Sequence, residues 1–205
     1  MSKFTKIGII NGFGNFKSVK NIFNYLNCDF IEIDNYKKLD QTTHIILPGV
    51  GSYDNVIADL KKRDLFNALQ DQISNSNKYY FGICIGMQIL STLGHENNEV
   101  YGFNSIPGET KKIKVIKERL PNMGWHQIIR KKDSVLFKNI NDDDTFYFLH
   151  SYQLIADNID HVTSIINYEE QIVSSVESNN IYGVQFHPEK SQISGIKIIK
   201  NFINL

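Results

Sequence analysis

The run Gly82–Gln88 is the part of the chain best suited to covalent chemistry. It places Cys84 between two glycines, directly after the apolar run Tyr79–Phe81. Such an apolar run is typical of a short buried strand, and the following residues predict a helix over 87–93. A side chain at a tight strand-to-helix turn is held away from the backbone, and glycines flank it because a Cβ there would clash. The N–H groups that open a helix also favour a thiolate. The sequence therefore predicts a cysteine nucleophile.

A base for this nucleophile is available near the end of the chain. Pro188 disfavours helical backbone at His187, which predicts an extended segment in which His187 and Glu189 project to the same side. The carboxylate would then fix the tautomer of the imidazole and stabilise its charged form. A lone cysteine is more often a small buried apolar residue, and a lone histidine is usually structural. Neither reading explains both features, so the residues favour a Cys84–His187–Glu189 triad.

Acyl chemistry also requires hydrogen-bond donors for a developing oxyanion. The backbone N–H of Ile85 follows the nucleophile directly. The turn Pro48–Gly51 offers a second donor, for which Val50 and Gly51 are the candidates. The run Asn11–Gly14 is rich in glycine but lacks the third glycine of a dinucleotide-binding motif, so no nucleotide cofactor is expected.

Strand-like and helical runs alternate in the first half of the chain, which predicts a parallel sheet covered on both faces. The strands are expected at residues 6–10, 29–33, 43–47 and 79–81, and the helices at 18–26, 53–60 and 65–73. In open α/β sheets the ligand binds beyond the carboxyl ends of the strands. The loops with suggestive chemistry all follow predicted strands, so we expect them to meet at one edge of the sheet.

The second half is richer in short strands and is expected to add antiparallel strands to this sheet. These strands are expected at 110–115, 125–129, 145–149, 163–166, 172–176 and 181–186, and a last helix at 193–204. The apolar residues of the last helix predict that it packs on a sheet face. The fold class is therefore α/β, a single domain over 1–205 with a mixed, mostly parallel sheet and helices on both faces.

Composition excludes several classes of protein. The 205 residues include 22 basic and 22 acidic side chains, so no basic surface for nucleic acid or an anionic membrane is implied. The run Met1–Lys6 lacks the apolar region of a signal peptide, so none is expected, and no apolar stretch approaches the ~18 residues of a membrane span. Two cysteines exclude a disulfide framework, and the six histidines lack metal-ligand spacing. A cytoplasmic protein without a metal is expected.

Taken together, the motifs resemble those of the class I, or triad, glutamine amidotransferases, whose fold is flavodoxin-like. Within that superfamily the chain is similar to the glutaminase subunits of imidazole glycerol phosphate synthase, over essentially its whole length. The runs that resemble those subunits are Leu47–Gly51, Met123–Trp125, Phe146–Tyr152 and Gln185–Gln192.

The resemblance implies a reaction. Cys84 would attack the side-chain amide of L-glutamine, giving a γ-glutamyl thioester and ammonia, and water would then release glutamate. No cofactor is implied. The residues that the resemblance assigns to glutamine binding are Gln88, Glu96, His150, Ser151 and Tyr152.

The resemblance also implies a partner. The predicted domain occupies the whole chain, so its ammonia is expected to pass to another polypeptide, a (β/α)8-barrel synthase that forms a heterodimer with it in histidine biosynthesis. Reorientation of the Pro48–Gly51 backbone would switch the glutaminase on when the synthase binds its ligand. The residues expected near the partner are Asn11, Asn15, Asn122, Trp125 and Lys190.

Two segments depart from the family pattern. Asn11–Asn15 is one residue shorter than the usual Asp-Tyr-Gly-x-Gly-Asn and lacks the acid, and Pro121–His126 has Asn and His where the family has His and Asn. These departures leave the partner open, and the chain could instead supply ammonia to a sugar amidotransferase in surface-glycan synthesis. Two other classes compete with the family resemblance. One is a stand-alone γ-glutamyl cysteine hydrolase; the other is a binding protein that keeps only the fold, which would have lost a triad member, whereas this chain retains all three.

Overall fold

A central eight-stranded sheet organises the protein, whose computed structural model describes residues 5–14, 16–75 and 78–205. Its strand order is β2-β1-β3-β4-β14-β13-β12-β9. The strands are β1 (Ile7–Ile10), β2 (Phe30–Ile33), β3 (His44–Leu47), β4 (Tyr79–Ile83), β9 (Ile129–Arg130), β12 (Val162–Asn167), β13 (Gln171–Ser178) and β14 (Ile181–Val184). Neighbours from β2 to β14 are parallel, and those from β14 to β9 are antiparallel. The predicted mixed, mostly parallel sheet is confirmed.

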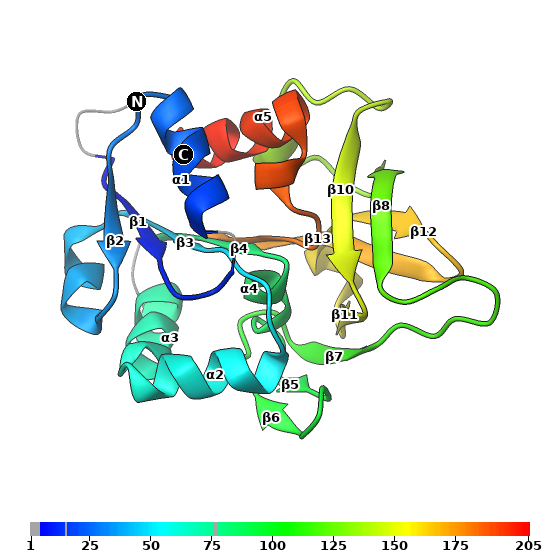
Figure 1. Ribbon diagram of the computed structural model, residues 1–205, viewed down its shortest axis with the longest axis horizontal. Helices are drawn as coiled ribbons and strands as arrows, with labels where there is room; N and C mark the ends of the chain where they lie inside the picture. Colours follow the sequence, from blue (N-terminus) through cyan, green and yellow to red (C-terminus); the bar gives the residue numbers. More distant parts are fainter. Residues whose placement is uncertain (1–4, 15, 76–77) are drawn as a thin grey trace.

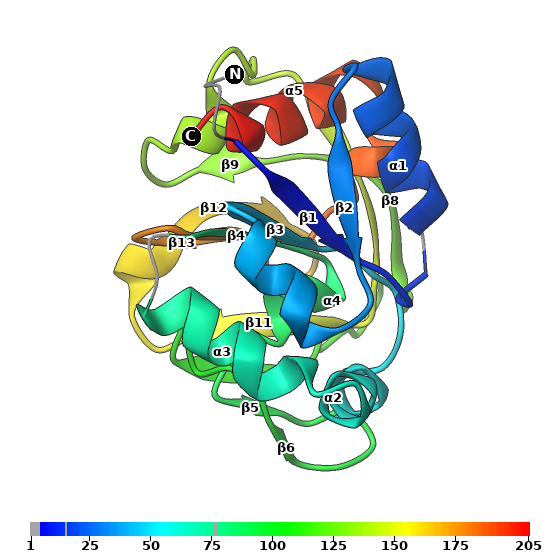
Figure 2. The ribbon, with the colours of Figure 1, turned by 90° about the vertical axis from the view of Figure 1, so that its left-hand side faces the viewer.

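Helices cover both faces of the sheet, as Figures 1 and 2 show. Helices α1 (Phe16–Tyr25) and α5 (Gln192–Ile203) lie on one face, and α2 (Tyr53–Lys62) and α3 (Leu65–Asn75) lie on the other. Two separate apolar clusters follow from this arrangement. Phe23 and Phe202 belong to the first cluster and Leu60 to the second. Because both faces are covered, the parallel strands are continuous apolar runs, and all four residues of β1 and of β3 are buried.

Two smaller sheets stand beside the main one. Strand β10 (Thr145–His150) pairs antiparallel with β8 (Asn122–Gln127). The other small sheet has the order β11-β7-β5-β6. Its strands are β5 (Leu93–Gly94), β6 (Val100–Tyr101), β7 (Gly108–Lys112) and β11 (Tyr152–Ala156). The expected antiparallel additions to the main sheet are therefore present in β9, β12 and β13, whereas β7, β8 and β10 pair elsewhere.

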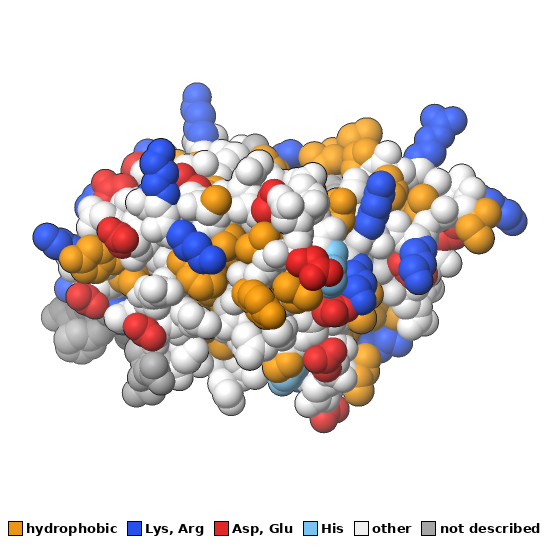
Figure 3. Space-filling view, turned by 90° about the horizontal axis from the view of Figure 1, so that it is seen from below, with side chains coloured by type: hydrophobic (Ala, Val, Ile, Leu, Met, Phe, Trp, Pro, Cys, Tyr) orange, Lys and Arg blue, Asp and Glu red, His pale blue; other side chains and the backbone are white. Residues whose placement is uncertain are grey.

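Short 3-10 turns complete the chain at Tyr36–Gln41, Val135–Phe137, Ile159–His161 and Pro188–Lys190. None of the helices in the described ranges is long and apolar enough to cross a membrane. Basic, acidic and apolar side chains are interspersed on the face shown in Figure 3. That mixture agrees with the balanced charge of the sequence.

The prediction of a helix over 87–93 is wrong. Helix α4 has four residues (Ile85–Gln88), and the chain then turns toward β5. The carbonyls that a longer helix would need are taken by a later loop. The carbonyl of Ile89 accepts from the N–H of Phe103, and that of Leu90 accepts from the N–H groups of Ser105 and Ile106. Tertiary pairing therefore ends the helix after one turn.

Candidate active site

Cys84 lies at the strained turn that the sequence predicts between β4 and α4. Its φ is 55° and its ψ is −106°, a conformation that residues with a Cβ rarely adopt. A Cβ on Gly82 would overlap the carbonyl of Gly86, and one on Gly86 would overlap the carbonyl of Leu47. Both glycines are therefore required by close backbone contacts. Because α4 has only one turn, few aligned peptide dipoles act on the sulfur, and individual N–H groups matter more.

His187 and Glu189 are in direct contact. Nδ1 of His187 lies 2.8 Å from Oε1 of Glu189, and each side chain is only 1% exposed. The contact is as predicted, but the backbone differs from the prediction. His187 is extended, whereas Pro188–Lys190 forms a 3-10 turn that brings the carboxylate back to the ring. Since a carboxylate accepts hydrogen bonds, Nδ1 is the protonated nitrogen and Nε2 is left for proton exchange.

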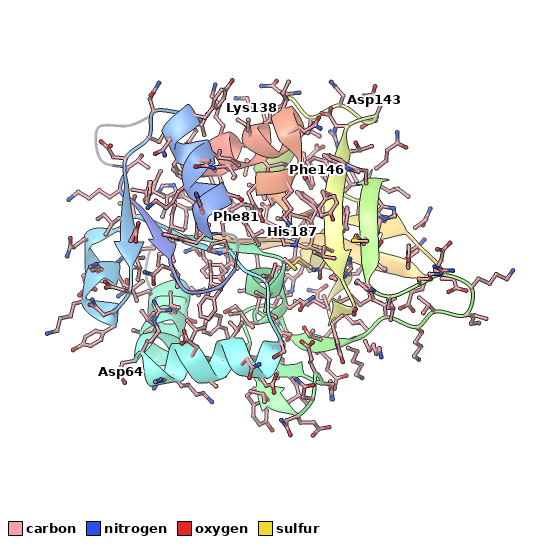
Figure 4. The ribbon with its side chains drawn as sticks, in the orientation of Figure 1. Asp64, Phe81, Lys138, Asp143, Phe146 and His187 are labelled. Atoms are coloured by element: carbon pink, nitrogen blue, oxygen red, sulfur yellow. The ribbon has the colours of Figure 1, made fainter. Side chains whose placement is uncertain are left out.

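The main chain of His187 is held by strand β10 and by Ser191. The N–H of His187 donates to the carbonyl of Tyr147 at 2.8 Å. The Ser191 hydroxyl donates to the His187 carbonyl at 2.7 Å and accepts from the N–H of Tyr147 at 3.0 Å. In Figure 4, His187 lies near the middle of the molecule, below Phe146 of β10. The main chain that carries the His187 ring is therefore held by β10 and by Ser191.

Charge determines the protonation of His187. Burial lowers the pKa of its imidazole, but the Cys84 sulfur and the Glu189 carboxylate outweigh burial and raise that pKa to about 10. Its Nε2 atom is buried and makes no hydrogen bond among the described residues. An imidazolium beside a thiolate is the arrangement needed to activate a cysteine and then to protonate a leaving amine.

The predicted oxyanion and glutamine-binding residues share one cavity. This cavity has a volume of about 210 Å³. Its lining comprises Val50, Gly51, Cys84, Ile85, Gln88, Glu96, Pro121, Leu149, His150, Ser151 and Tyr152. Residues that lie far apart in the sequence thus surround the sulfur, at the carboxyl ends of β3 and β4.

Two backbone segments can supply N–H donors to this cavity. Ile85 is the first residue of α4, so its N–H has no partner inside the helix. The second segment contains Gly51, whose φ of 147° is rarely adopted by residues that have a Cβ. Because glycine tolerates many backbone conformations, the peptide groups of this turn can change orientation.

Gln88 and Glu96 are both anchored in the cavity wall. Nε2 of Gln88 donates to the Tyr152 carbonyl at 2.8 Å and to Oε1 of Gln185 at 3.0 Å. Both N–H groups of Gln88 are thus engaged, which leaves its carbonyl oxygen to meet a ligand. Oε2 of Glu96 accepts from the N–H of Tyr53 at 2.8 Å, and burial raises the pKa of this carboxyl.

His150 is a neutral, fully bonded histidine. Its Nδ1 donates to the Tyr152 carbonyl at 2.8 Å, and its Nε2 accepts from Nδ2 of Asn122 at 3.0 Å. Burial lowers its pKa to about 4, and that effect exceeds the opposing hydrogen bond to Tyr152. Oδ1 of Asn122 accepts from Nε2 of His126 at 2.8 Å. The two residues that depart from the family pattern therefore bond to each other.

The expectation that Asn122 lies near a partner stays a prediction, but its side chain does not reach the surface. Asn122 is 0% exposed, because it lies on the inner face of β8 with its amide enclosed by His126 and His150. Asn11 is half-buried, and its Oδ1 accepts from Nη2 of Arg63 at 2.8 Å. Asn15 lies outside the described residues.

Trp125 and Lys190 come together at the surface around Tyr147. The ring centroids of Trp125 and Tyr147 are 5.8 Å apart, and Nζ of Lys190 lies 5.4 Å from the Tyr147 centroid. Trp125 is 45% exposed. Tyr147 was missed as a candidate, although the alternation along β10 signals it, since Phe146 and Phe148 point inward and leave Tyr147 outward.

Gln185 is the second residue that sequence reasoning missed. It is 0% exposed, and its Nε2 donates to Sγ of Cys84 at 3.5 Å. A polar side chain in an otherwise apolar buried run was the available signal. Among the residues that the structure describes, no group of three or more His, Cys, Asp or Glu is arranged to hold a metal.

Comparison with known proteins agrees with this geometry. The family model described as "Glutamine amidotransferase class-I" matches residues 9–205. The chain belongs to this family. Among the similar class I relatives is the imidazole glycerol phosphate synthase subunit HisH of Pelagibacter ubique, 37% identical and aligned over 94% of this chain and 95% of the relative. The subunit of the same name from Leptospira borgpetersenii is 36% identical over 97% of this chain and 100% of the relative.

Solved structures show the same class I fold at low sequence identity. One is a glutamine amidotransferase with a TM-score of 0.74 and 13% identity, which covers 97% of each chain. Another is a glutamine amidotransferase from Thermotoga maritima with a TM-score of 0.67 and 17% identity, covering 98% of this chain and 81% of that one. These likenesses establish the fold of this amidotransferase.

Proposed function

We propose that this chain is the glutaminase subunit of an imidazole glycerol phosphate synthase, acting in histidine biosynthesis as a single domain over 1–205. It hydrolyses L-glutamine to glutamate and ammonia and passes the ammonia to a synthase subunit. The contact between His187 and Glu189 behind a cavity that contains Cys84 is the observation that supports this proposal most strongly. The names of the relatives, which are subunits of imidazole glycerol phosphate synthase, support the assignment to this synthase.

Glutamine binds in the cavity with its side-chain amide toward Cys84. The carbonyl oxygen of Gln88 accepts from the substrate, because both N–H groups of that amide are engaged elsewhere. The Glu96 carboxylate faces the same cavity and attracts the substrate's α-ammonium group. The segment His150–Tyr152 closes the opposite wall and offers backbone groups to the substrate.

The thiolate of Cys84 then attacks the amide carbon of glutamine, forming an S–C bond and a tetrahedral oxyanion. Nε2 of the His187 imidazolium gives its proton to the departing nitrogen, so ammonia leaves and a γ-glutamyl thioester remains. The neutral imidazole next takes a proton from water, whose oxygen attacks the thioester. The S–C bond then breaks, which releases the acyl group as glutamate and returns Cys84 to its thiolate form. Glu189 holds the imidazole in the tautomer that both steps require.

The oxyanion is stabilised by backbone N–H groups that line the cavity beside Cys84. Ile85 contributes one donor, and the Val50–Gly51 segment contributes the other. The positive φ of Gly51 allows the peptide groups of this segment to rotate, and partner binding selects the arrangement that points a donor inward.

The partner is a (β/α)8-barrel synthase that covers the surface formed by Trp125, Tyr147 and Lys190. An exposed tryptophan and a tyrosine in contact are residue types enriched at binding hot spots, and Lys190 lies over the tyrosine ring. A cytoplasmic location belongs to the same proposal. Reducing conditions there keep cysteines as thiols, and neither Cys28 nor Cys84 forms a disulfide bond among the described residues.

Replacing Cys84 by alanine tests the chemistry. Glutamate release with the synthase subunit present should fall by about 10³-fold or more, because both steps use the sulfur. The matched control is Cys28→Ala, which removes the other buried cysteine and should leave the rate of release unchanged. Residual activity of Cys84→Ala equal to that of the control would refute the nucleophile.

The partner is tested by the rate of the unmodified chain with and without a synthase subunit and its ligand. Acceleration on addition of the synthase is the expected result. Full activity in the isolated chain would instead identify a stand-alone hydrolase. Acceleration by a sugar amidotransferase alone would assign the ammonia to surface-glycan synthesis.

A further inference from the structure

Gln185 connects the nucleophile to the glutamine-binding wall through its buried amide. Its Nε2 lies 3.5 Å from Sγ of Cys84, and its Oε1 lies 3.0 Å from Nε2 of Gln88. The side chain is 0% exposed, so no water competes for either contact. Its backbone N–H donates to the Ser174 carbonyl at 2.9 Å, which fixes the main chain at the same point.

The direction of each hydrogen bond follows from the chain of contacts itself. The Tyr152 carbonyl can only accept, so the Gln88 atom 2.8 Å from it must be the amide nitrogen. That nitrogen also lies 3.0 Å from Gln185, whose facing atom must therefore be the carbonyl oxygen. The remaining end of the Gln185 amide is then its nitrogen, and that end contacts Cys84 Sγ. The Tyr152 carbonyl, through Gln88, thus determines that the Gln185 amide presents its N–H group to the sulfur.

The Tyr152 carbonyl is well held in this role. It also accepts from Nδ1 of His150 at 2.8 Å, so two donors engage its oxygen. The opposite nitrogen of His150 is bonded to Asn122, which is itself buried. A reversed amide at Gln88 would oppose oxygen to oxygen at this carbonyl and again at Gln185. Either contact would leave buried polar atoms unsatisfied, which is costly.

We propose that Gln185 is a catalytic residue that stabilises the thiolate of Cys84 through its side-chain N–H, in an orientation imposed by Gln88 and the Tyr152 carbonyl. A hydrogen bond donated to the charged form favours that form. The donor therefore increases the fraction of thiolate before the attack on the amide. In the second step it also stabilises the sulfur that leaves the thioester. This inference rests on the proposed function in that Cys84 is the nucleophile.

The test measures the thiolate directly, without glutamine. In a Cys28→Ala background, Cys84 is the remaining cysteine, and iodoacetamide alkylates its thiolate with release of iodide. The rate as a function of pH gives a midpoint and a high-pH plateau. Because the sulfur and His187 interact, the midpoint reports the pair.

Replacing Gln185 by methionine keeps the side-chain length and removes the donor. The midpoint should rise by about one pH unit or more, and alkylation below the midpoint should slow about tenfold, as expected for a lost hydrogen bond to a charged group. The plateau should stay the same. A loss of plateau without movement of the midpoint would indicate a packing role and would overturn the proposal.

Gln88→Met tests the imposed orientation, because the side chain of Gln88 bonds the Gln185 amide, whose nitrogen contacts the sulfur. The midpoint should again rise, by less than in Gln185→Met, since the Gln185 amide becomes free to rotate. An unchanged midpoint would overturn this part of the proposal. Gln70→Met is the matched control, because Gln70 also donates to a backbone carbonyl, that of Phe103 at 3.1 Å, but lies on α3.

Gln185→Glu keeps the proposal testable if the methionine variant fails to fold. An acceptor with negative charge beside Sγ should raise the midpoint further than methionine does. A midpoint unchanged or lowered by this variant would refute the role of the donor. These outcomes do not depend on glutamine turnover, so failure of this inference is distinct from failure of the proposed glutaminase activity.

Discussion

The carboxyl ends of β4 and β14 differ sharply from the outer face of β8 and β10. At the first region, Cys84 is 6% exposed and His187 is 0% exposed, and hydrogen bonds from several elements hold them. At the second region, Trp125 is 45% exposed and Met123 is 65% exposed, with contacts mainly between side chains. The chain therefore completes its triad internally and leaves an apolar surface beside it uncovered.

Strand β8 belongs to both regions because its side chains alternate. Asn122 and His126 face inward and join the hydrogen bonds around His150, whereas Met123 and Trp125 face outward. A strand with this pattern can respond to a partner on one side and contact the site on the other. The triad is therefore held by buried contacts from several elements, whereas the surface beside it is formed by single exposed side chains.

The largest expected effect is that of Gly86→Ala in the first region. A Cβ there would overlap the Leu47 carbonyl in the centre of the sheet, so we expect a loss of about 4 kcal/mol or more of the free energy of unfolding. Thermal unfolding measures it. The control is Gly124→Ala on β8, where φ is 154° but an added Cβ meets nothing within 4 Å. That change should cost only about 1 kcal/mol of backbone strain. Equal losses would contradict the contrast between the two regions.

Glu189→Gln should reduce glutamate release by about 10²- to 10⁴-fold while the fold remains intact. The change removes one of the two negative groups that oppose burial and raise the pKa of His187 to about 10, so that pKa must fall. Nuclear magnetic resonance of the imidazole at increasing pH follows this change. An unmoved titration midpoint would show that Glu189 has no electrostatic role.

The matched control for Glu189→Gln is Glu99→Gln. Glu99 also faces a histidine, with Oε1 3.4 Å from Nδ1 of His95, but its side chain is 74% exposed. Water screens such a pair, and the loss of its charge should leave glutamate release and stability within experimental error. Only the buried pair is expected to matter.

The smallest effect on the folded chain is expected for Trp125→Ala in the second region. Stability should change by about 0.5 kcal/mol or less, because the ring is half exposed. The dissociation constant for the synthase should rise by about 30-fold, as for a hot-spot aromatic. Titration calorimetry measures it, with Tyr101→Ala as control, an aromatic 71% exposed on β6. Equal affinity of the two variants for the synthase would show that Trp125 does not lie in the interface.

The sequence predicted the elements that local patterns control. Apolar runs located the parallel strands, and the glycines around Cys84 predicted its turn, because backbone sterics act within a few residues. It failed where distant segments compete for the same groups. The loop at Phe103–Ile106 takes the carbonyls that would have extended α4, and nothing near Met87 indicates it.

The family, the nucleophile turn and the candidate partners of Cys84 could be read from residue types and short spacings, which are local properties of the sequence. The orientations of the side chains could not, because they arise only in the folded chain. The tertiary structure turned Asn122 inward, directed Asn11 to Arg63, and aimed the Gln185 amide at the sulfur. Asn122 and Gln185 each carry buried polar atoms that must find partners on another element, and that requirement takes effect only when the chain is packed.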